Sequence, residues 1–447
     1  MKTRFFVVSV VAFVLELVGG AAATVRPALA AELPAALTEF LQSARVHNRA
    51  LGISRAQLEQ QDAGVRQSLS SLTPSLQASA GYTRNQYSAT PLIPTTSPTG
   101  TGPPSFQQIV IQPYNLWTGS VGVNVPLLNM PGVYRYEGSK QAREAARQGE
   151  RASEAEVLLS TAKGYYQVVG AQGVVDAAET AVRTAEDNLK ITEAKFREGT
   201  ANRLSVERAR ADVARANQTL VAARQTLAVA VRNLETLSGR AVSGRLPESA
   251  EPEPVNGTED DFVRNAESRR PELAQLTATM RQQEASVKES WAALAPSVSA
   301  NVAEHYSTAT GFTGQDFYWT AGATLSWNLD PVGTPAAARR ARAATEEQRQ
   351  RWLQERDAVR DEVHSSWIDV GAIRARLEQA VAGAKSSNDA LEITRVQFRE
   401  GTATSLEVSQ AQRDAFNANA TLAQARADLS AAVLALKKSA GEPLLPE

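Results

Sequence analysis

The chain has 447 residues, and its 47 lysines and arginines nearly balance its 48 aspartates and glutamates. This balance excludes the strongly basic surface that nucleic-acid binding requires. The absence of cysteine excludes disulfides, cysteine-ligated metal and a lipid anchor on an N-terminal cysteine.

The first 30 residues are typical of an export signal. Lys2 and Arg4 precede the apolar run FFVVSVVAFVL, and residues 28–30 (ALA) form a small-x-small cleavage site before Ala31. The run is too short for a membrane-spanning helix. We therefore expect a signal peptide over 1–30 and an exported mature protein.

Two pairs of segments show the period-two alternation of β-strands, and we expect strands at about 76–87, 115–127, 297–306 and 317–329. In WTGSVGVNVPL, which starts at Trp117, apolar side chains alternate with Thr, Ser, Gly and Asn. Such alternation over about 9–11 residues suits a tilted strand between lipid and a wet lumen. An ordinary antiparallel sheet with one buried face would need an apolar cover, which the remaining sequence does not obviously offer. Four strands are too few to close a membrane barrel, since the smallest single-chain barrels have about eight, so we expect several chains to share one barrel.

Two long proline-free stretches predict very long helices. No proline occurs between Pro131 and Pro247 or between Pro335 and Pro443, and proline breaks helix interiors. Apolar residues recur there every seven positions with alanine three places later, as in closely packed coiled coils. This seam runs through Val206, Val213, Leu220, Leu227 and Leu234, and again through Val408, Ala415, Leu422, Leu429 and Leu436. A helix of such length, about 100 Å at 1.5 Å per residue, suits a rod or a tunnel and not a compact domain.

The hexapeptide FREGTA occurs twice, at 196–201 and 398–403, 202 positions apart. The same offset relates Trp117 to Trp319 and Gly239 to Gly441. We therefore expect an internal structural duplication. The boundaries we expect are a first repeat over 31–240, a linker over 241–260 and a second repeat over 261–447.

Each hexapeptide lies where one long helix should end and the next begin, with tips at about 197–204 and 399–406. Glycine suits the left-handed end of a helix, and threonine can hydrogen-bond nearby backbone in a turn. The repetition, and an apolar residue at an exposed turn, suggest that a partner recognises the tips. Alternatively, the duplicated turns have simply stayed alike. The residues concerned are Gly199, Thr200 and Leu204 in the first tip and Gly401, Thr402 and Leu406 in the second.

The whole pattern resembles the TolC family of outer-membrane efflux proteins. The resemblance covers essentially the whole chain after the signal, including the duplicated strand–strand–helix–helix unit. Its motifs are SLTPSL from Ser71, ALAPSV from Ala293, RRPEL from Arg269 and the G-T-x-x-x-L tips at Gly199 and Gly401. Their order and spacing together are highly specific.

The resemblance implies a mixed α and β membrane protein in the cell outer membrane. Three identical chains of four strands would form one twelve-stranded β-barrel, continued across the periplasm by a long α-helical coiled-coil barrel. The implied function is the channel-tunnel of a tripartite efflux or type I secretion system, which passively conducts substrates to the exterior. The implied partners are a periplasmic adaptor (membrane fusion) protein, an inner-membrane pump of RND, ABC or MFS type, and outer-membrane lipid. The resemblance implies no cofactor and no nucleic-acid partner.

The resemblance also implies roles for individual residues. The adaptor-facing positions are Gly199, Thr200, Leu204, Gly401, Thr402 and Leu406. The candidate gate positions are Ser205, Phe398, Glu407 and Gln410. Glu407 matches an acidic position of a constricting ring, whereas Ser205 and Gln410 stand at positions that are acidic in relatives. Phe398 replaces a tyrosine whose hydroxyl helps to hold the closed state.

Two other classes of protein fit less well. His47, His305 and His364 lack the spacing of a metal site, and no nucleophile elbow or phosphate-binding glycine loop marks an enzyme. An exported structural coiled-coil surface protein without transport activity suits the heptads and the export signal, but not the two separated strand pairs. The substrate, the pump class and the resting state of the gate stay open.

Overall fold

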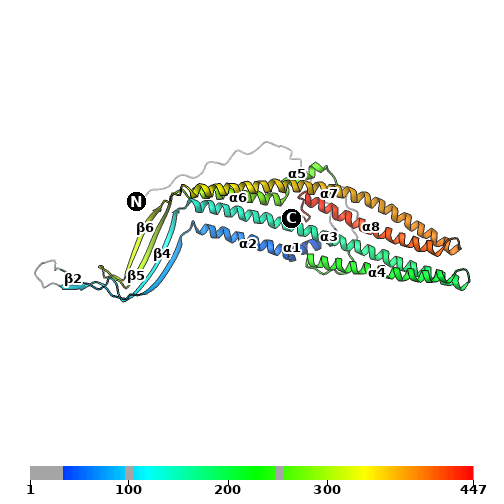
Figure 1. The fold of residues 1–447 in the computed structure, drawn as a ribbon, viewed down its shortest axis with the longest axis horizontal. Coiled ribbons are helices and arrows are strands. Elements are labelled where there is room, and N and C mark those ends of the chain that lie inside the picture. The colour runs from blue at the N-terminus through cyan, green and yellow to red at the C-terminus, as the bar shows by residue number, and fades with distance from the viewer. Residues whose placement is uncertain (1–33, 96–104, 248–254, 446–447) are drawn as a thin grey trace, which may run out of the picture.

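The computed structural model describes residues 34–95, 105–247 and 255–445, so the predicted export signal lies outside the described residues. The molecule is strongly elongated (Figure 1). Strands occupy one end and two helical hairpins form the other end. Shorter helices lie beside the long ones between the sheet and the middle of the molecule; we call residues 35–70 and 259–292, with the segments 239–247 and 440–445, the belt. The sheet and the hairpin tips therefore lie towards opposite ends of the chain.

Four long helices form the two hairpins. Helices α3 (Met130–Arg197) and α7 (Gly333–Glu400) are each 68 residues long. α3 turns back into α4 (Arg203–Ser238), and α7 turns back into α8 (Ser405–Ser439). None of the described helices carries an apolar stretch long enough to cross a bilayer.

The predicted heptad positions on α4 and α8 are all buried or half-buried. The buried ones on α4 are Val206, Ala209, Ala223, Ala230 and Leu234, and on α8 they are Val408, Ala415, Ala425, Leu429 and Leu436. Alanine at alternate seam positions lets the two helix backbones approach closely. α3 also packs along α8, which joins the two hairpins side by side.

Shorter helices link the hairpins to the sheet. The first pair is α1 (Ala35–His47) and α2 (Arg49–Ser70), and the second is α5 (Glu259–Arg269) and α6 (Pro271–Ala292). Each pair breaks at one residue, Asn48 or Arg270, which adopts extended backbone angles. The Asn48 side chain caps α2 and also donates to the Leu237 carbonyl at 2.8 Å, so it fixes this break against the end of α4.

The sheet is antiparallel with the order β1-β4-β5-β6. Its strands are β1 (Ser75–Arg84), β4 (Asn115–Leu128), β5 (Ser297–Ser307) and β6 (Phe317–Ser326). A separate pair, β2 (Leu92–Thr95) with β3 (Ser105–Gln108), extends beyond the sheet and was not predicted. β6 stops three residues short of the predicted end at 329.

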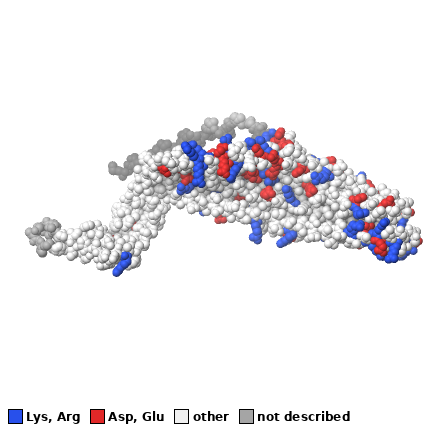
Figure 2. Space-filling view, in the orientation of Figure 1, with Lys and Arg blue, Asp and Glu red and all other residues white. Residues whose placement is uncertain are grey.

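The two faces of the sheet differ in polarity. Apolar side chains on one face are largely exposed, including Trp117 at 54%, Val121 at 54% and Trp319 at 71%. The other face carries hydroxyl and imidazole groups that bond across strands, such as Ser79 to Ser120 at 2.8 Å. Figure 2 shows almost no charged side chains over this end of the molecule. Nothing in the described chain covers the apolar face.

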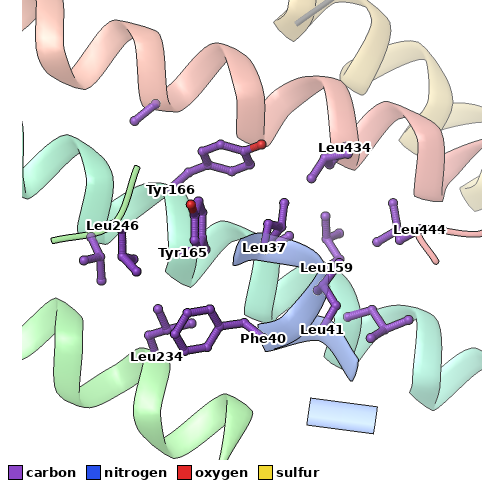
Figure 3. Close-up of a cluster of buried hydrophobic side chains, with 14 of the residues drawn as sticks. Leu37, Phe40, Leu41, Leu159, Tyr165, Tyr166, Leu234, Leu246, Leu434 and Leu444 are labelled. Atoms are coloured by element: carbon purple, nitrogen blue, oxygen red, sulfur yellow. The ribbon is translucent and has the colours of Figure 1, made fainter. Parts of the chain in front are cut away.

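The belt contains a hydrophobic core that brings distant parts of the chain together (Figure 3). Leu37 on α1 and Leu444 near the C-terminus are both buried there, together with Tyr165 on α3, Leu234 on α4 and Leu434 on α8. The Tyr165 hydroxyl donates to the Pro247 carbonyl at 3.2 Å, and burial raises the pKa of this phenol to about 12. This core packs α1, the segment around Leu246 and the C-terminal segment around Leu444 against α3, α4 and α8.

Candidate functional site

The first hairpin tip is a tight turn built on glycine. Gly199 has φ = +78°, a left-handed conformation that favours glycine. The Thr200 hydroxyl donates to the Lys195 carbonyl at 3.1 Å, which satisfies an orphan carbonyl at the end of α3. Asn202 then caps α4, because its side chain accepts from both the backbone N–H and the hydroxyl of Ser205 at 2.9 Å.

The second tip repeats this backbone with a different cap. Gly401 has φ = +86°, and the Thr402 hydroxyl donates to the Gln397 carbonyl at 3.1 Å. Thr404 and Glu407 form a capping box, in which the Glu407 carboxylate accepts from the Thr404 N–H at 2.6 Å and from its hydroxyl at 2.9 Å. These two hydrogen bonds from Thr404, the backbone one first, lower the pKa of Glu407. Glu407 is therefore ionised at neutral pH and its carboxylate takes part in the tip turn.

Most of the other predicted tip and gate residues are exposed to solvent in the single chain. Leu204 is 55% exposed and Leu406 is 46% exposed, each at the first turn of an outgoing helix. Gln410 is also exposed, one turn after Glu407 on α8, and Ser205 is half-buried. The two tips lie side by side at the same end of the molecule (Figure 1), so one surface includes both.

One contact between the tips was not predicted. Phe398 at the end of α7 is only 6% exposed, whereas Phe196, its counterpart in the first hexapeptide, is 45% exposed. Lys195 on α3 donates to the Phe398 carbonyl, and its ammonium lies 4.7 Å from the centroid of the Phe398 ring. This cation–π contact ties the first hairpin to the second just above their tips. The periodicity of the sequence could not predict this contact, because it joins residues 203 positions apart.

Charged side chains crowd this end of the molecule, as Figure 2 shows. Arg210 on α4 pairs with both Glu193 and Glu207, and Arg395 on α7 approaches Asp187 on α3 at 3.8 Å. These ion pairs are exposed and contribute little stability each. Within residues 34–95, 105–247 and 255–445, no cluster of acidic and histidine side chains is arranged to hold a metal ion.

Comparison with known proteins identifies this architecture. Residues 40–240 and 262–442 match the sequence model of the outer membrane efflux proteins. The chain belongs to this family. Family members are channels and not enzymes, and membership assigns the chain to efflux transport and to the outer membrane. Among curated proteins, no relative matches the chain by sequence.

Solved channels share the fold at low sequence identity. The Campylobacter jejuni CmeC outer membrane channel is 18% identical with a TM-score of 0.72, over 91% of this chain and 85% of that one. VceC from Vibrio cholerae is 16% identical with a TM-score of 0.73, over 91% and 96%. The open-state MtrE channel of Neisseria gonorrhoeae is 17% identical with a TM-score of 0.72, over 91% and 89%.

Proposed function

We propose that this outer membrane efflux protein is the channel-tunnel of a tripartite efflux or type I secretion system. Three copies form one duct that passes substrates from a periplasmic adaptor and an inner-membrane pump to the exterior. Each copy contributes two repeats of a strand pair and a helical hairpin, over 31–240 and 261–447, joined by the linker 241–260. An export signal over 1–30 directs the chain to the periplasm, and no cysteine is needed to anchor it.

The observation that carries this proposal is the arrangement of one nearly uncharged sheet and two long hairpins at opposite ends of the same chain (Figures 1 and 2). The exposed apolar face of the sheet suits lipid, and its hydroxyl-rich face suits a wet lumen. Four strands cannot enclose a lumen alone. Two copies would give about eight strands, whose interior side chains can fill, whereas three copies supply twelve strands and leave room for an open lumen. The 68-residue helices then continue the lumen away from the membrane. A structural stalk would have no use for a sheet with one apolar face.

We assign adaptor docking to the two tips. Gly199, Thr200 and Leu204 match Gly401, Thr402 and Leu406 in both sequence and backbone conformation. An apolar leucine exposed on a highly charged surface loses unfavourable hydration when a partner covers it. Two alike tips per chain give six similar docking points per trimer.

We assign the constriction of the duct to the residues directly above the tips. Glu407 and Gln410 follow each other by one turn on α8, and Ser205 and Phe398 stand at the corresponding levels of α4 and α7. Three symmetry-related Glu407 carboxylates would repel one another and attract cations. The Lys195 contact to Phe398 supplies a link between hairpins that does not need a tyrosine hydroxyl.

Transport in the native host tests the docking assignment. Leu406→Ser removes the exposed apolar group without straining the backbone. We expect it to reduce efflux about threefold to tenfold, because covering the exposed half of this leucine contributes about 0.7–1.5 kcal/mol. Combining it with Leu204→Ser should abolish efflux, while the yield of trimers in the outer membrane stays unchanged.

Two further variants separate docking from the turn itself. Gly401→Asn keeps a residue that tolerates positive φ and should retain most efflux, whereas Gly401→Arg adds bulk and strain and should abolish it. Full efflux by the double leucine variant at normal trimer yield would place adaptor docking elsewhere.

A further inference from the structure

The sheet has two free edges. In the order β1-β4-β5-β6, β1 and β6 each have one neighbour in the described chain and leave one row of backbone N–H and C=O groups unpaired. An edge within lipid needs a partner, because hydrocarbon offers no hydrogen bonds. We propose that β1 of one copy pairs with β6 of the next in a single register, which the internal repeat of the sheet specifies. This inference rests on the proposed trimeric channel.

The two outer strand pairs establish which strands are counterparts. Leu76 on β1 pairs with Val123 on β4, and Val298 on β5 pairs with Leu325 on β6. Val123 and Leu325 are 202 positions apart, the offset of the repeated tips, and Leu76 and Val298 each follow the dipeptide Pro-Ser. β5 is therefore the counterpart of β1, and β6 is the counterpart of β4, residue for residue.

The central pair of strands then serves as a template for the missing pair. β4 and β5 align Val123 with Val302 and Asn124 with Asn301. Replacing each strand by its counterpart gives the register of β6 against β1 of the adjacent copy. The resulting pairs, with the residue of the partner subunit second, are Arg84 with Ala321, Tyr82 with Ala323, Ala80 with Leu325, Ser79 with Ser326, Ala78 with Trp327 and Gln77 with Asn328.

The polarity of the side chains agrees with this register independently. Apolar Ala78 and Ala80 fall opposite apolar Trp327 and Leu325, and polar Ser79 falls opposite polar Ser326. A shift by one residue would turn one whole strand over and place its polar row on the lipid side. Ser79 already hydrogen-bonds Ser120 within the chain, so the Ser326 hydroxyl would extend a polar row along the lumen.

The counterpart strands β4 and β6 differ in length, and this difference also supports pairing of β6 with β1 of another copy. β4 continues through residues 125–128, where its partner is β5. The counterpart residues 327–330 are not in a strand in the single chain, and β6 ends at Ser326. β6 lacks the neighbour that β4 has at this position. Residues 327 and 328 should therefore join the sheet when β1 of another copy is present.

Cross-linking in the cysteine-free chain tests the register. In the double variant Ser79→Cys with Ser326→Cys, directly opposed Cα atoms would lie about 4.5–5.5 Å apart, within the range of a disulfide. Within one copy the two sites are three strand spacings apart, about 14 Å, so no disulfide can form there. Oxidation of detergent-solubilised trimers with copper phenanthroline should convert most of the protein into covalent trimers on a non-reducing denaturing gel.

Two mismatched variants provide the control. Ser79→Cys combined with Thr324→Cys or with Asn328→Cys keeps the same face but shifts the pair by two residues, to a diagonal distance of about 7–8 Å. We expect at least about tenfold less cross-linking there, since that distance exceeds the disulfide range. If light scattering shows a trimer but a mismatched pair cross-links better than Ser79→Cys with Ser326→Cys, or no pair cross-links, the proposed register is wrong and the trimeric channel stands. A monomer in detergent would overturn both the proposed channel and the pairing of β1 with β6.

Discussion

At the scale of single residues, the two identical hexapeptides show how assembly and sequence are related. Phe398 is covered within the chain by Lys195, whereas Phe196 is exposed. The residue that corresponds to Lys195 in the second repeat is Gln397, which is exposed at the end of α7. In a ring of alternating hairpins, Phe196 would lie against Gln397 of the partner subunit. In the proposed trimer, the contact of Lys195 with Phe398 would be one of two alternating contacts, and the other would have Gln397 in place of the cation.

Glu407 has two roles that substitution can separate. Its carboxylate caps α8 through Thr404, and its charge is the proposed source of cation preference at the constriction. Glu407→Gln keeps an oxygen that can accept from Thr404 but removes the charge. We expect this variant to lower cation preference and weaken divalent block in planar bilayers, with normal protection of the tip amides in hydrogen exchange.

Glu407→Ala provides the matched comparison and a pH test. It removes both roles, so tip amides should exchange faster at neutral pH. The lowered pKa of Glu407 means that the carboxylate stabilises the tip above the unfolded glutamate pKa of about 4.3, and that this is lost as the pH falls through the lower folded value. Protection of the tip in the wild type should approach that of Glu407→Ala in this acidic range. If Glu407→Gln leaves ion selectivity and divalent block unchanged, Glu407 does not line the constriction.

At the scale of elements, the motif RRPEL forms the break between α5 and α6. Arg270 is only 5% exposed; it pairs with Glu272 at 3.0 Å and with Glu362 of α7 at 2.5 Å. It also donates to the Ser439 carbonyl at the end of α8. Pro271 starts α6, where a missing N–H costs nothing. The motif therefore anchors the shorter helices to the second hairpin through a buried cation.

Removing this buried cation should destabilise the belt. We expect Arg270→Ala to cost about 3 kcal/mol, because Glu272 and Glu362 lose their main partner. The measurement is the midpoint of thermal unfolding in detergent. Arg264→Ala on the neighbouring helix is the control, since Arg264 makes an exposed pair with Asp261 that contributes little stability. Equal effects of the two substitutions would contradict a structural role for Arg270.

The same network predicts a dependence on pH. Burial alone would raise the pKa of Glu362, but hydrogen bonds and charge from Arg270, with Lys438, bring it below its usual value. Glu362 therefore stabilises the folded chain above the unfolded pKa of about 4.3, and this contribution disappears as the pH falls through the lower folded value. Arg270→Ala should weaken this acid dependence.

The elements also show which features a sequence can predict. Heptads and period-two alternation are local patterns, so the seam through Val206 and Leu234 and the alternating strand from Trp117 could be predicted directly. The contacts of Lys195 with Phe398 and of Arg270 with Glu362 join distant elements, and no local period encodes them. The end of β6 was overestimated, because residues 327–329 alternate like a strand but have no neighbouring strand in one copy.

At the scale of the whole molecule, a single copy has an unusually large surface. It exposes 28784 Å², whereas a compact monomer of this size would expose about 16,000 Å². Apolar side chains remain exposed along the helices as well as on the sheet, including Val221 at 67%, Ile368 at 52% and Ile393 at 58%. Lipid could cover the sheet, but the helices extend far beyond it. Other copies of the chain are the natural cover for them.

The purified protein should therefore be a homotrimer that depends on detergent. Light scattering should give a protein mass three times that of the mature chain, and circular dichroism should be dominated by helix. On removal of detergent the trimer should precipitate, because the apolar face with Trp117 and Trp319 would meet water. High salt should not release the protein from membranes, since its attachment is hydrophobic and not electrostatic. A monodisperse monomer in detergent-free buffer, or release by salt alone, would contradict the shared barrel and favour a structural surface protein.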